Sequence, residues 1–108
     1  MSFRVLLTHD AVRDLEDIYD YITEHVAPGK ADDVLDRTEK ALAGLRHSPE
    51  RGVWPRELSA LGMREFREIF FKPYRIIYRI IGQDVYVMLI ADGRRDMQTL
   101  LQRRLLRA

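Results

Sequence analysis

The sequence predicts an α+β fold with an N-terminal strand, an antiparallel two-helix hairpin, a three-stranded antiparallel meander and a short C-terminal helix. Two observations carry this prediction: a helical period fills residues 10–48 and the tail, and strand-forming runs cluster between residues 64 and 91. The chain has 108 residues, of which 46% are hydrophobic. This length and composition suit one core, so a single domain over residues 1–108 is expected.

The first strand is predicted over Phe3 to Thr8, a short apolar run that ends at residues able to cap a helix. Apolar side chains then recur at steps of three and four in two successive segments. The first set is Val12, Leu15, Ile18, Tyr19, Ile22 and Val26, and the second is Ala31, Val34, Leu35, Thr38, Leu42 and Leu45. Pro28-Gly29 separates the segments, so two helices joined by a short link are expected to pack antiparallel.

No sustained period runs from Pro49 to Gly62, and this stretch is predicted to be a loop. Strand-like runs follow at residues 64–71, 74–81 and 84–91, separated by the pairs 72–73 and 82–83. The last of the three is apolar on both faces and is therefore expected in the centre of the sheet. In the middle run, alternation places Arg75 and Arg79 on one face and Tyr74 and Tyr78 on the core face.

The C-terminal helix is expected to begin after Asp96, which can cap it. Its inward-facing residues are predicted to be Met97, Leu100, Leu101 and Leu105, and its outward-facing residues Arg103, Arg104 and Arg107.

Charge divides the chain into an acidic and a basic half. Residues 1–63 hold eight Lys/Arg and twelve Asp/Glu, whereas residues 64–108 hold ten and five. Such asymmetry is typical of a protein whose basic part meets an anionic partner. The alternatives are that the two halves attract each other or that both are simply solvated surfaces.

Several classes of chemistry have no support in the sequence. Without cysteine, thiol chemistry is excluded, and His9, His25 and His47 show no metal-ligand spacing, so no metal site is expected. The isolated glycines give no phosphate-binding loop, and no cofactor is predicted. The N-terminal run MSFRVLLTHD is too short for a signal peptide or a membrane span, which predicts a soluble, cytoplasmic protein without membrane contacts.

Arginine is the remaining source of chemistry, because guanidinium groups bind phosphates and carboxylates in bidentate fashion. The predicted anion-binding or target-binding patch consists of Arg75, Arg79, Arg94 and Arg95. In the alternative, Arg94 or Arg95 pairs with Asp92 or Asp96 and fixes the corner after the last strand. For Arg79 the alternative is a solvated residue or one in a helix-facing salt bridge.

Aromatic residues also have two readings. Trp54 in the predicted loop is interpreted as a lid that packs over the core, with a base-stacking platform as the alternative. Because Tyr74 and Tyr78 face the core, neither is expected to be catalytic.

The run PYRIIYRIIGQDVYVMLIADGRRD resembles the signature of RelE/ParE-superfamily toxins of type II toxin–antitoxin systems. In that signature a Tyr-Arg-x-x-Tyr strand precedes an apolar strand and a Gly-Arg-Arg-Asp corner. The first helix is similar to the family at Ala11, Asp14, Leu15, Ile18 and Tyr19, and the tail RRDMQTLLQRRLL resembles members of the ParE branch.

The resemblance implies one of two activities. Members of the RelE type are ribosome-dependent messenger-RNA endoribonucleases that use basic residues and a tyrosine, whereas members of the ParE type inhibit DNA gyrase. Arg75 and Arg95 match the family's strand and corner arginines and would be the catalytic candidates of a nuclease. Phe66 and Glu68 stand where the nuclease branch has lysines, and Leu100 and Leu101 replace its tyrosine. The resemblance therefore favours a gyrase inhibitor without catalytic residues, with the ribosome-dependent nuclease as the alternative.

The resemblance also implies a protein partner. Family toxins are neutralised by an antitoxin with an acidic, disordered segment that folds onto the toxin. Residues expected to contact it are Trp54, Arg103, Arg104 and Arg107. A heterocomplex with a cognate antitoxin follows, and the free toxin is expected to inhibit growth. A family member that only binds the antitoxin and is not toxic is the second alternative.

Overall fold

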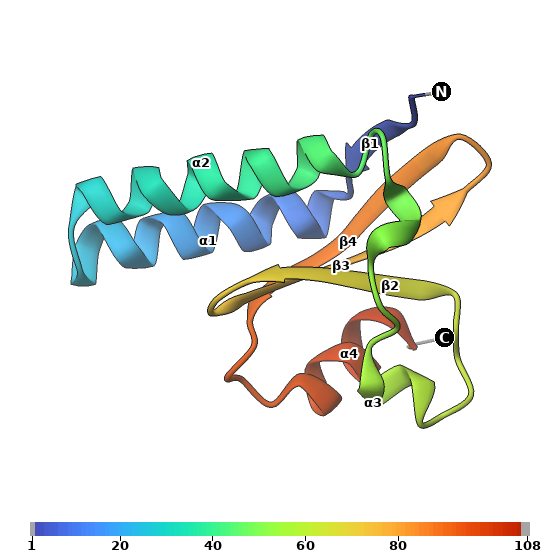
Figure 1. Ribbon diagram of the computed structural model, residues 1–108. Helices are drawn as coiled ribbons and strands as arrows, with labels where there is room; N and C mark the ends of the chain where they lie inside the picture. The colour runs from blue at the N-terminus through green and yellow to red at the C-terminus, as the bar shows by residue number, and fades with distance from the viewer. Residues whose placement is uncertain (1, 107–108) are drawn as a thin grey trace.

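The computed structural model describes residues 2–106 and has the predicted α+β element order with two short helices added (Figure 1). The strands are β1 (Arg4–Leu7), β2 (Phe66–Phe71), β3 (Tyr74–Ile81) and β4 (Asp84–Asp92). The helices are α1 (His9–His25), α2 (Pro28–Gly44), the 3₁₀ turn η1 (Pro49–Arg51), α3 (Arg56–Ser59) and α4 (Met97–Leu105).

One four-stranded sheet forms the middle layer, in the order β1-β4-β3-β2. The predicted antiparallel meander is confirmed for β2, β3 and β4. β1 joins it parallel to β4, from the pair Arg4 and Asp84 to the pair Leu7 and Val87, so the sheet is mixed. β4 therefore lies inside the sheet, as its apolar sequence predicts.

Helices cover both faces of the sheet, α1 and α2 on one side and α3 and α4 on the other (Figure 1). β4 contributes side chains to both cores, and it carries one extra residue, Met88, opposite β3. Val85 and Val87 pack in the core beneath the hairpin, and beyond the bulge Leu89 points to the α4 side while Ile90 points back to the hairpin. A bulge of this kind switches the phase of alternation along a strand.

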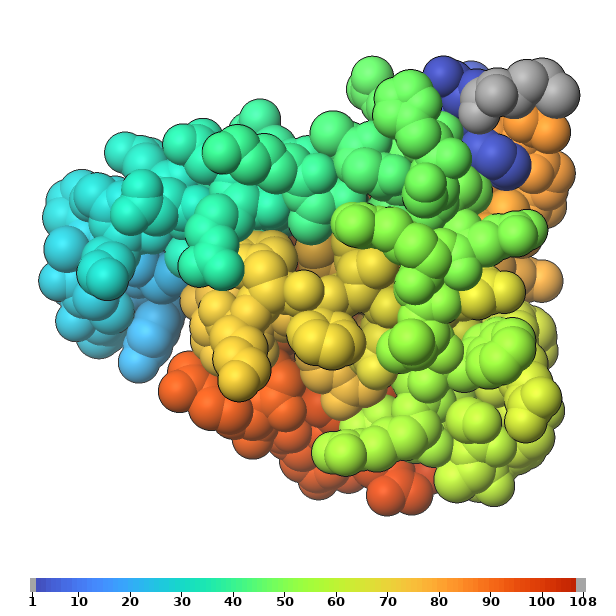
Figure 2. All heavy atoms as spheres, in the orientation of Figure 1, coloured from blue at the N-terminus to red at the C-terminus, as the bar shows by residue number. Residues whose placement is uncertain are grey.

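The α1–α2 hairpin begins at a side-chain cap and extends past the sheet as an arm (Figure 2). The Thr8 hydroxyl accepts a hydrogen bond from the Ala11 amide at 3.1 Å and donates one to the Val87 carbonyl at 3.1 Å, fixing the start of α1 on β4. Pro28 does not lie between the helices, because α2 starts with it. Proline fits the first helical turn, where its missing N–H has no intrahelical acceptor to lose.

The prediction of a loop from Pro49 to Gly62 was wrong in part, since this stretch contains η1 and α3. The buried Tyr78 hydroxyl anchors η1, donating to the Pro49 carbonyl and accepting from the Gly52 amide at 3.1 Å. A Cβ at Gly52 would lie 2.2 Å from that hydroxyl oxygen, so only glycine fits this contact. α3 has four residues, too few for a helical period to show in the sequence.

α4 follows the predicted pattern on its apolar side. Asp96 caps it by accepting hydrogen bonds from the Thr99 amide at 3.2 Å and the Thr99 hydroxyl at 2.8 Å. Met97, Leu100 and Leu101 are buried against the sheet. Through these residues α4 closes the second core and brings Arg104 to the Met88 carbonyl of β4.

Candidate functional site

Arg75 of β3 lies in a closed ion pair and is not part of an open cationic surface. Its Nη1 and Nη2 each donate to Glu57 of α3 at 2.8 Å, and its Nε donates to Glu68 of β2 at 2.6 Å. The Arg75 side chain is 14% exposed. Two carboxylates thus surround one guanidinium, so an incoming phosphate would meet net negative charge at this position.

The ion pair shifts the pKa values of Arg75 and Glu57. The hydrogen bond from Arg75 lowers the pKa of Glu57, although partial burial opposes this. The hydrogen bonds to Glu57 and Glu68 raise the pKa of Arg75, again against desolvation. Both shifts favour the charged forms of Arg75 and Glu57, and their ion pair holds α3 against the sheet.

Gly93, the first residue of the Gly-Arg-Arg-Asp corner, is packed against Arg75. Its amide donates to the Pro73 carbonyl at 2.7 Å, and a Cβ at Gly93 would lie 2.9 Å from Cδ of Arg75. The aliphatic stem of Arg75 cannot move away easily because both ends of its guanidinium are held. Close approach explains a glycine at this corner.

The corner arginines behave differently from each other. Arg94 folds back onto Asp92, with Nη2 to Oδ2 at 2.6 Å and Nε to Oδ1 at 2.9 Å. This contact lowers the pKa of Asp92 and bears out the alternative in which Arg94 fixes the corner. Arg95 is exposed, and within residues 2–106 its guanidinium forms no ion pair.

Arg79 lies in a second cationic region, away from the corner. It shares a hollow of about 360 Å³ with Arg64 and Arg67, and its Nη2 lies 3.8 Å from Oε2 of Glu65. Both side chains of that ion pair are about half exposed, as expected for a weak surface contact. Arg75, Arg79, Arg94 and Arg95 therefore do not assemble into the single open patch predicted from the sequence.

Trp54 is not a lid over the core, so that interpretation was wrong. It remains 42% exposed, with the guanidinium carbons of Arg64 and Arg67 at 5.0 and 5.1 Å from its ring centroid. Arg67 is held in place by donating to the Glu50 and Gly52 carbonyls. The sequence analysis did not place Arg64 and Arg67 beside Trp54, because their proximity depends on tertiary contacts such as the Val53–Glu68 bridge.

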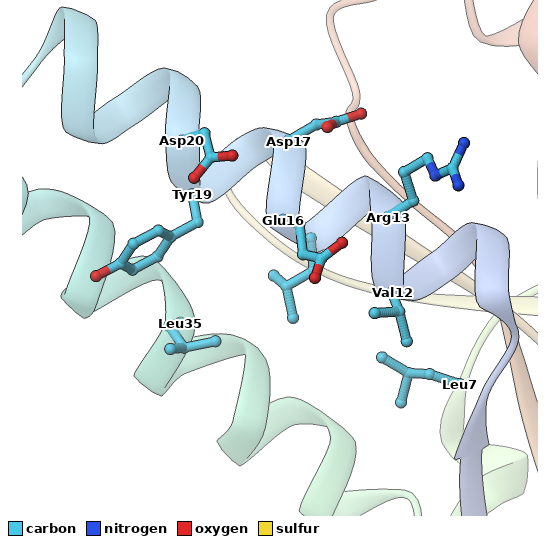
Figure 3. Close-up of a pocket in the computed structure, with 9 residues that line it drawn as sticks. Leu7, Val12, Arg13, Glu16, Asp17, Tyr19, Asp20 and Leu35 are labelled. Atoms are coloured by element: carbon cyan, nitrogen blue, oxygen red, sulfur yellow. The ribbon is translucent and has the colours of Figure 1, made fainter.

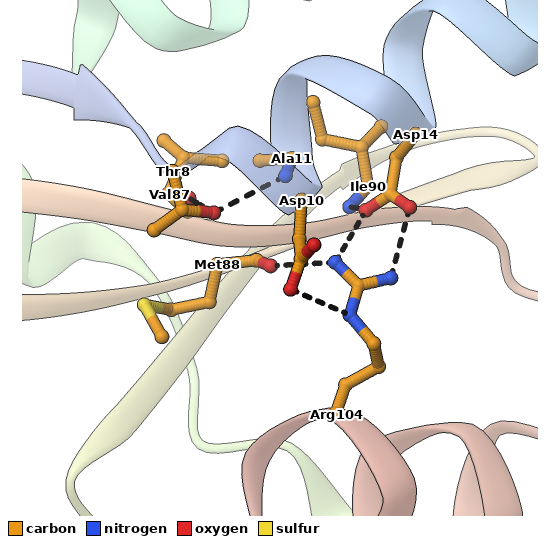
Figure 4. Close-up of polar contacts among 8 residues, drawn as sticks. All are labelled: Thr8, Asp10, Ala11, Asp14, Val87, Met88, Ile90 and Arg104. Atoms are coloured by element: carbon orange, nitrogen blue, oxygen red, sulfur yellow. Dashed lines mark hydrogen bonds and ion pairs between the residues drawn. The ribbon is translucent and has the colours of Figure 1, made fainter.

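Arg104 of α4 faces inward, contrary to the prediction that it points to solvent (Figure 4). It forms a bidentate pair with Asp14 of α1 at 2.9 and 3.0 Å and donates to the Met88 carbonyl at 3.1 Å. Asp14 in turn accepts from the Ile90 amide at 3.0 Å. Because β1 ends opposite Val87, this pair satisfies backbone groups of β4 where no strand covers them.

The arginines of the predicted antitoxin surface differ in their exposure. Arg103 is exposed on α4 as expected. Arg107 lies outside the described residues. Because Arg104 is occupied by Asp14, its contact with a partner would require breaking the link between α1 and α4. This link joins the acidic and basic halves of the chain. It agrees with the alternative in which the two halves attract each other.

A groove runs between α1 and the carboxyl end of β4, with a volume of about 490 Å³. Its apolar lining comes largely from α1 and includes Ile18, Tyr21 and Val26, and Arg94 and Arg95 stand at its other side. Tyr21 and Val26 are 60% and 61% exposed, respectively. Exposed apolar side chains beside two arginines are features of a protein-docking surface.

Chemistry that needs a metal has no support in the described part of the chain, where no group of three His, Cys, Asp or Glu residues could hold an ion. None of the helices in residues 2–106 is long and apolar enough to cross a membrane.

The sequence model of a known family, described as ParE toxin of type II toxin-antitoxin system, parDE, matches residues 5–97. The chain belongs to this ParE toxin family. A curated relative, toxin ParE3 of Caulobacter vibrioides, is 31% identical over 96 residues, which are 87% of this chain and 90% of the relative. The protein is thus a toxin of the type II toxin–antitoxin class, within the RelE/ParE superfamily that its C-terminal motif predicts.

Solved structures agree with this membership at the level of the fold. A chain of the chromosomal ParDE system of P. aeruginosa superposes with a TM-score of 0.69 at 18% identity, covering 84% of this ParE-family toxin and 96% of that chain. The toxin–antitoxin complex RelBE2 from Mycobacterium tuberculosis gives 0.56 at 21%, covering 85% and 99%. A mutant of E. coli toxin RelE in the free state gives 0.62 at 17%, covering 97% and 100%.

Proposed function

We propose that this ParE-family toxin inhibits DNA gyrase by binding it and does not cleave RNA. One observation carries the proposal: the positions that correspond to the basic and tyrosine residues of a RelE-type nuclease are closed. Phe66, Leu100 and Leu101 are at most 5% exposed in the core around α4. Glu68 is 8% exposed and bonded to Arg75. A nuclease site needs an accessible base and free cations around the scissile phosphate.

The electrostatics of Arg75 support the same proposal. To bind a phosphate, its guanidinium would have to leave Glu57 or Glu68, and the released carboxylate would then face the phosphate. Two like charges about 4 Å apart repel by roughly 4 kcal/mol at an effective dielectric constant near 20. We infer that Arg75 holds the fold together and that Arg95 is the only one of the two nuclease candidates within reach of a ligand.

The test places the purified toxin in two assays. One measures supercoiling of relaxed plasmid by gyrase, and the other measures cleavage of a messenger RNA on translating ribosomes. Inhibited supercoiling with intact RNA is expected. RNA cleavage that disappears in Arg95→Ala, with supercoiling unaffected, would replace the proposal by the nuclease function. Arg95 is exposed, so this substitution leaves the fold intact.

We also propose that a cognate antitoxin neutralises the toxin in the cytoplasm. The P. aeruginosa and M. tuberculosis relatives come from a toxin–antitoxin system and complex, respectively. Exposed Arg95 and Arg103 suit acidic residues of such a segment, and Trp54 and the apolar side chains of the groove between α1 and β4 suit its apolar residues. No cofactor is required for either interaction.

Coexpression with the protein encoded by the adjacent reading frame tests this second proposal. The pair is expected to copurify and to restore growth that the toxin alone arrests. Trp54→Ala and Arg103→Ala should each weaken the complex, because aromatic and arginine side chains contribute most to such interfaces. Absence of growth arrest by the toxin alone would favour the non-toxic alternative.

A further inference from the structure

A second groove lies on the α1–α2 arm and has a volume of about 650 Å³ (Figure 3). Its apolar floor comes from β1, α1 and α2, namely Leu7, Val12, Leu15 and Leu35. Ala11 and Ile22 mark the side of α1 that is buried against the rest of the fold. At about 100° per residue, Glu16 and Asp20 lie on the other side of the helix, and Val12 lies on its flank, about a quarter turn from Ala11 and Ile22. The groove therefore faces away from the sheet.

Acidic side chains surround this floor. Glu16, Asp17 and Asp20 line the groove together with a single cation, Arg13. All three carboxylates are exposed, and none of them forms an ion pair within residues 2–106. Residues 9–44, which form the arm, hold ten Asp/Glu and four Lys/Arg. The arm thus combines uncompensated negative charge with an apolar surface, of which Val12 alone is 41% exposed.

We propose that this arm groove docks a basic amphipathic helix on the protein that the toxin inhibits. Apolar side chains of the helix, spaced by three and four residues, would cover Val12 and Leu35. Lysine or arginine side chains beside them would meet Glu16, Asp17 and Asp20. The inference rests on the proposed function in one respect, namely that the toxin acts by binding a protein target.

Charge distinguishes this basic helix from two other possible occupants of the groove, an acidic antitoxin segment and a second copy of the toxin. An acidic antitoxin segment would be repelled in the arm groove by Glu16, Asp17 and Asp20. Arg64 and Arg67 beside Trp54, and Arg95 after β4, would attract it and lie outside this groove. A second copy of the toxin would offer fewer free cations, because Arg75, Arg94 and Arg104 of its basic half are already paired with carboxylates of their own chain. A basic segment of another protein has neither disadvantage.

Two variants with opposite predictions test the groove. The groove variant carries Val12→Lys, Glu16→Lys and Asp20→Lys, all at exposed positions. The control carries Thr23→Lys, Glu24→Lys and Asp36→Lys, which make the same change in charge at exposed arm positions that do not line the groove. Growth arrest on induction, inhibition of gyrase holoenzyme, the midpoint of thermal unfolding and binding of the cognate antitoxin are measured for both.

The groove variant is expected to lose growth arrest and to need at least tenfold more toxin for inhibition, while its unfolding midpoint and antitoxin binding match the control. Equal growth arrest by both variants would overturn the inference. So would loss of antitoxin binding by the groove variant alone, or a wild-type dimer in solution that this variant abolishes. If the wild-type toxin arrests growth without inhibiting gyrase, the proposed function is contradicted but the groove inference is not. The comparison of growth arrest between the two variants then still tests the groove.

Discussion

Individual residues of this toxin show how much the chemistry of an arginine depends on its neighbours. Arg75, Arg94 and Arg104 are each bound to a carboxylate at 3.0 Å or less, whereas Arg95 and Arg103 are exposed. Paired cations contribute to the fold and are not available to a ligand unless a carboxylate is displaced. Counting basic residues therefore overestimates the surface that can attract an anionic partner.

Glu57 gives the pairing a measurable pH dependence. Its pKa is lowered by Arg75, so its contribution to stability is present above the ordinary glutamate pKa and is lost as the pH falls through the lowered value. Glu57→Gln should reduce the free energy of unfolding at pH 7 by about 1–3 kcal/mol and by progressively less in acid. Urea unfolding between pH 3 and pH 7 measures this. Glu65→Gln, at the exposed pair with Arg79, is the control and should change little.

Gly93 provides a second prediction, which depends on the lack of room for a side chain at this position. Gly93→Ala places a Cβ 2.9 Å from Cδ of Arg75 and 3.3 Å from the Pro73 carbonyl oxygen, so the ion pair must shift. A loss of about 1–3 kcal/mol is expected in urea unfolding. Gly29→Ala, in α2 with no atom within 4 Å, should instead stabilise the protein slightly. Equal effects of the two substitutions would contradict the role assigned to the corner glycine.

Among the elements, β4 is the strand on which the structure depends most. It is hydrogen-bonded to β1 and β3 and supplies both cores, and its bulge at Met88 decides that Leu89 faces α4 and Ile90 faces the hairpin. β1 covers only its first part, from Asp84 to Val87. Beyond this point the side chains of Asp14 and Arg104 replace a strand, as shown in Figure 4. Such a cap protects an exposed strand edge from pairing with another chain.

Hydrogen exchange can test the cap at the end of β4. Asp14→Ala removes the acceptor of the Ile90 amide and leaves Arg104 without its partner. The Ile90 amide is therefore expected to exchange faster, and the free energy of unfolding should fall by about 1–3 kcal/mol. Asp17→Ala, an exposed residue of the same helix without an ion pair in residues 2–106, serves as control. Unchanged protection of Ile90 in Asp14→Ala would show that the backbone group is satisfied in another way.

At the scale of the whole molecule, an acidic arm and a basic sheet and C-terminal helix are joined by Arg104 and by the two cores that share β4. We propose that the chain unfolds as a single domain for this reason. Leu89→Ala should destabilise it by about 2–5 kcal/mol, because Leu89 is completely buried. Far-UV circular dichroism, dominated by the hairpin, and Trp54 fluorescence should report the same midpoint. An earlier midpoint for Trp54 would indicate that the two layers unfold separately.

Sequence alone determined the element order, the central place of β4 and the resemblance to the toxin superfamily, because these depend on local periodicity and on motifs that are continuous in the chain. The parallel pairing of β1, the bulge in β4 and the short α3 were not predictable, since each depends on packing between distant segments. The same limit applied to the site. The sequence showed Arg75, Arg94 and Arg104 as cations. Only the tertiary structure brought Glu57 and Glu68 to Arg75, and Asp14 to Arg104. It also left Trp54 exposed beside two arginines. Electrostatic interactions act through space, and therefore the fold decided which of these charges a partner can meet.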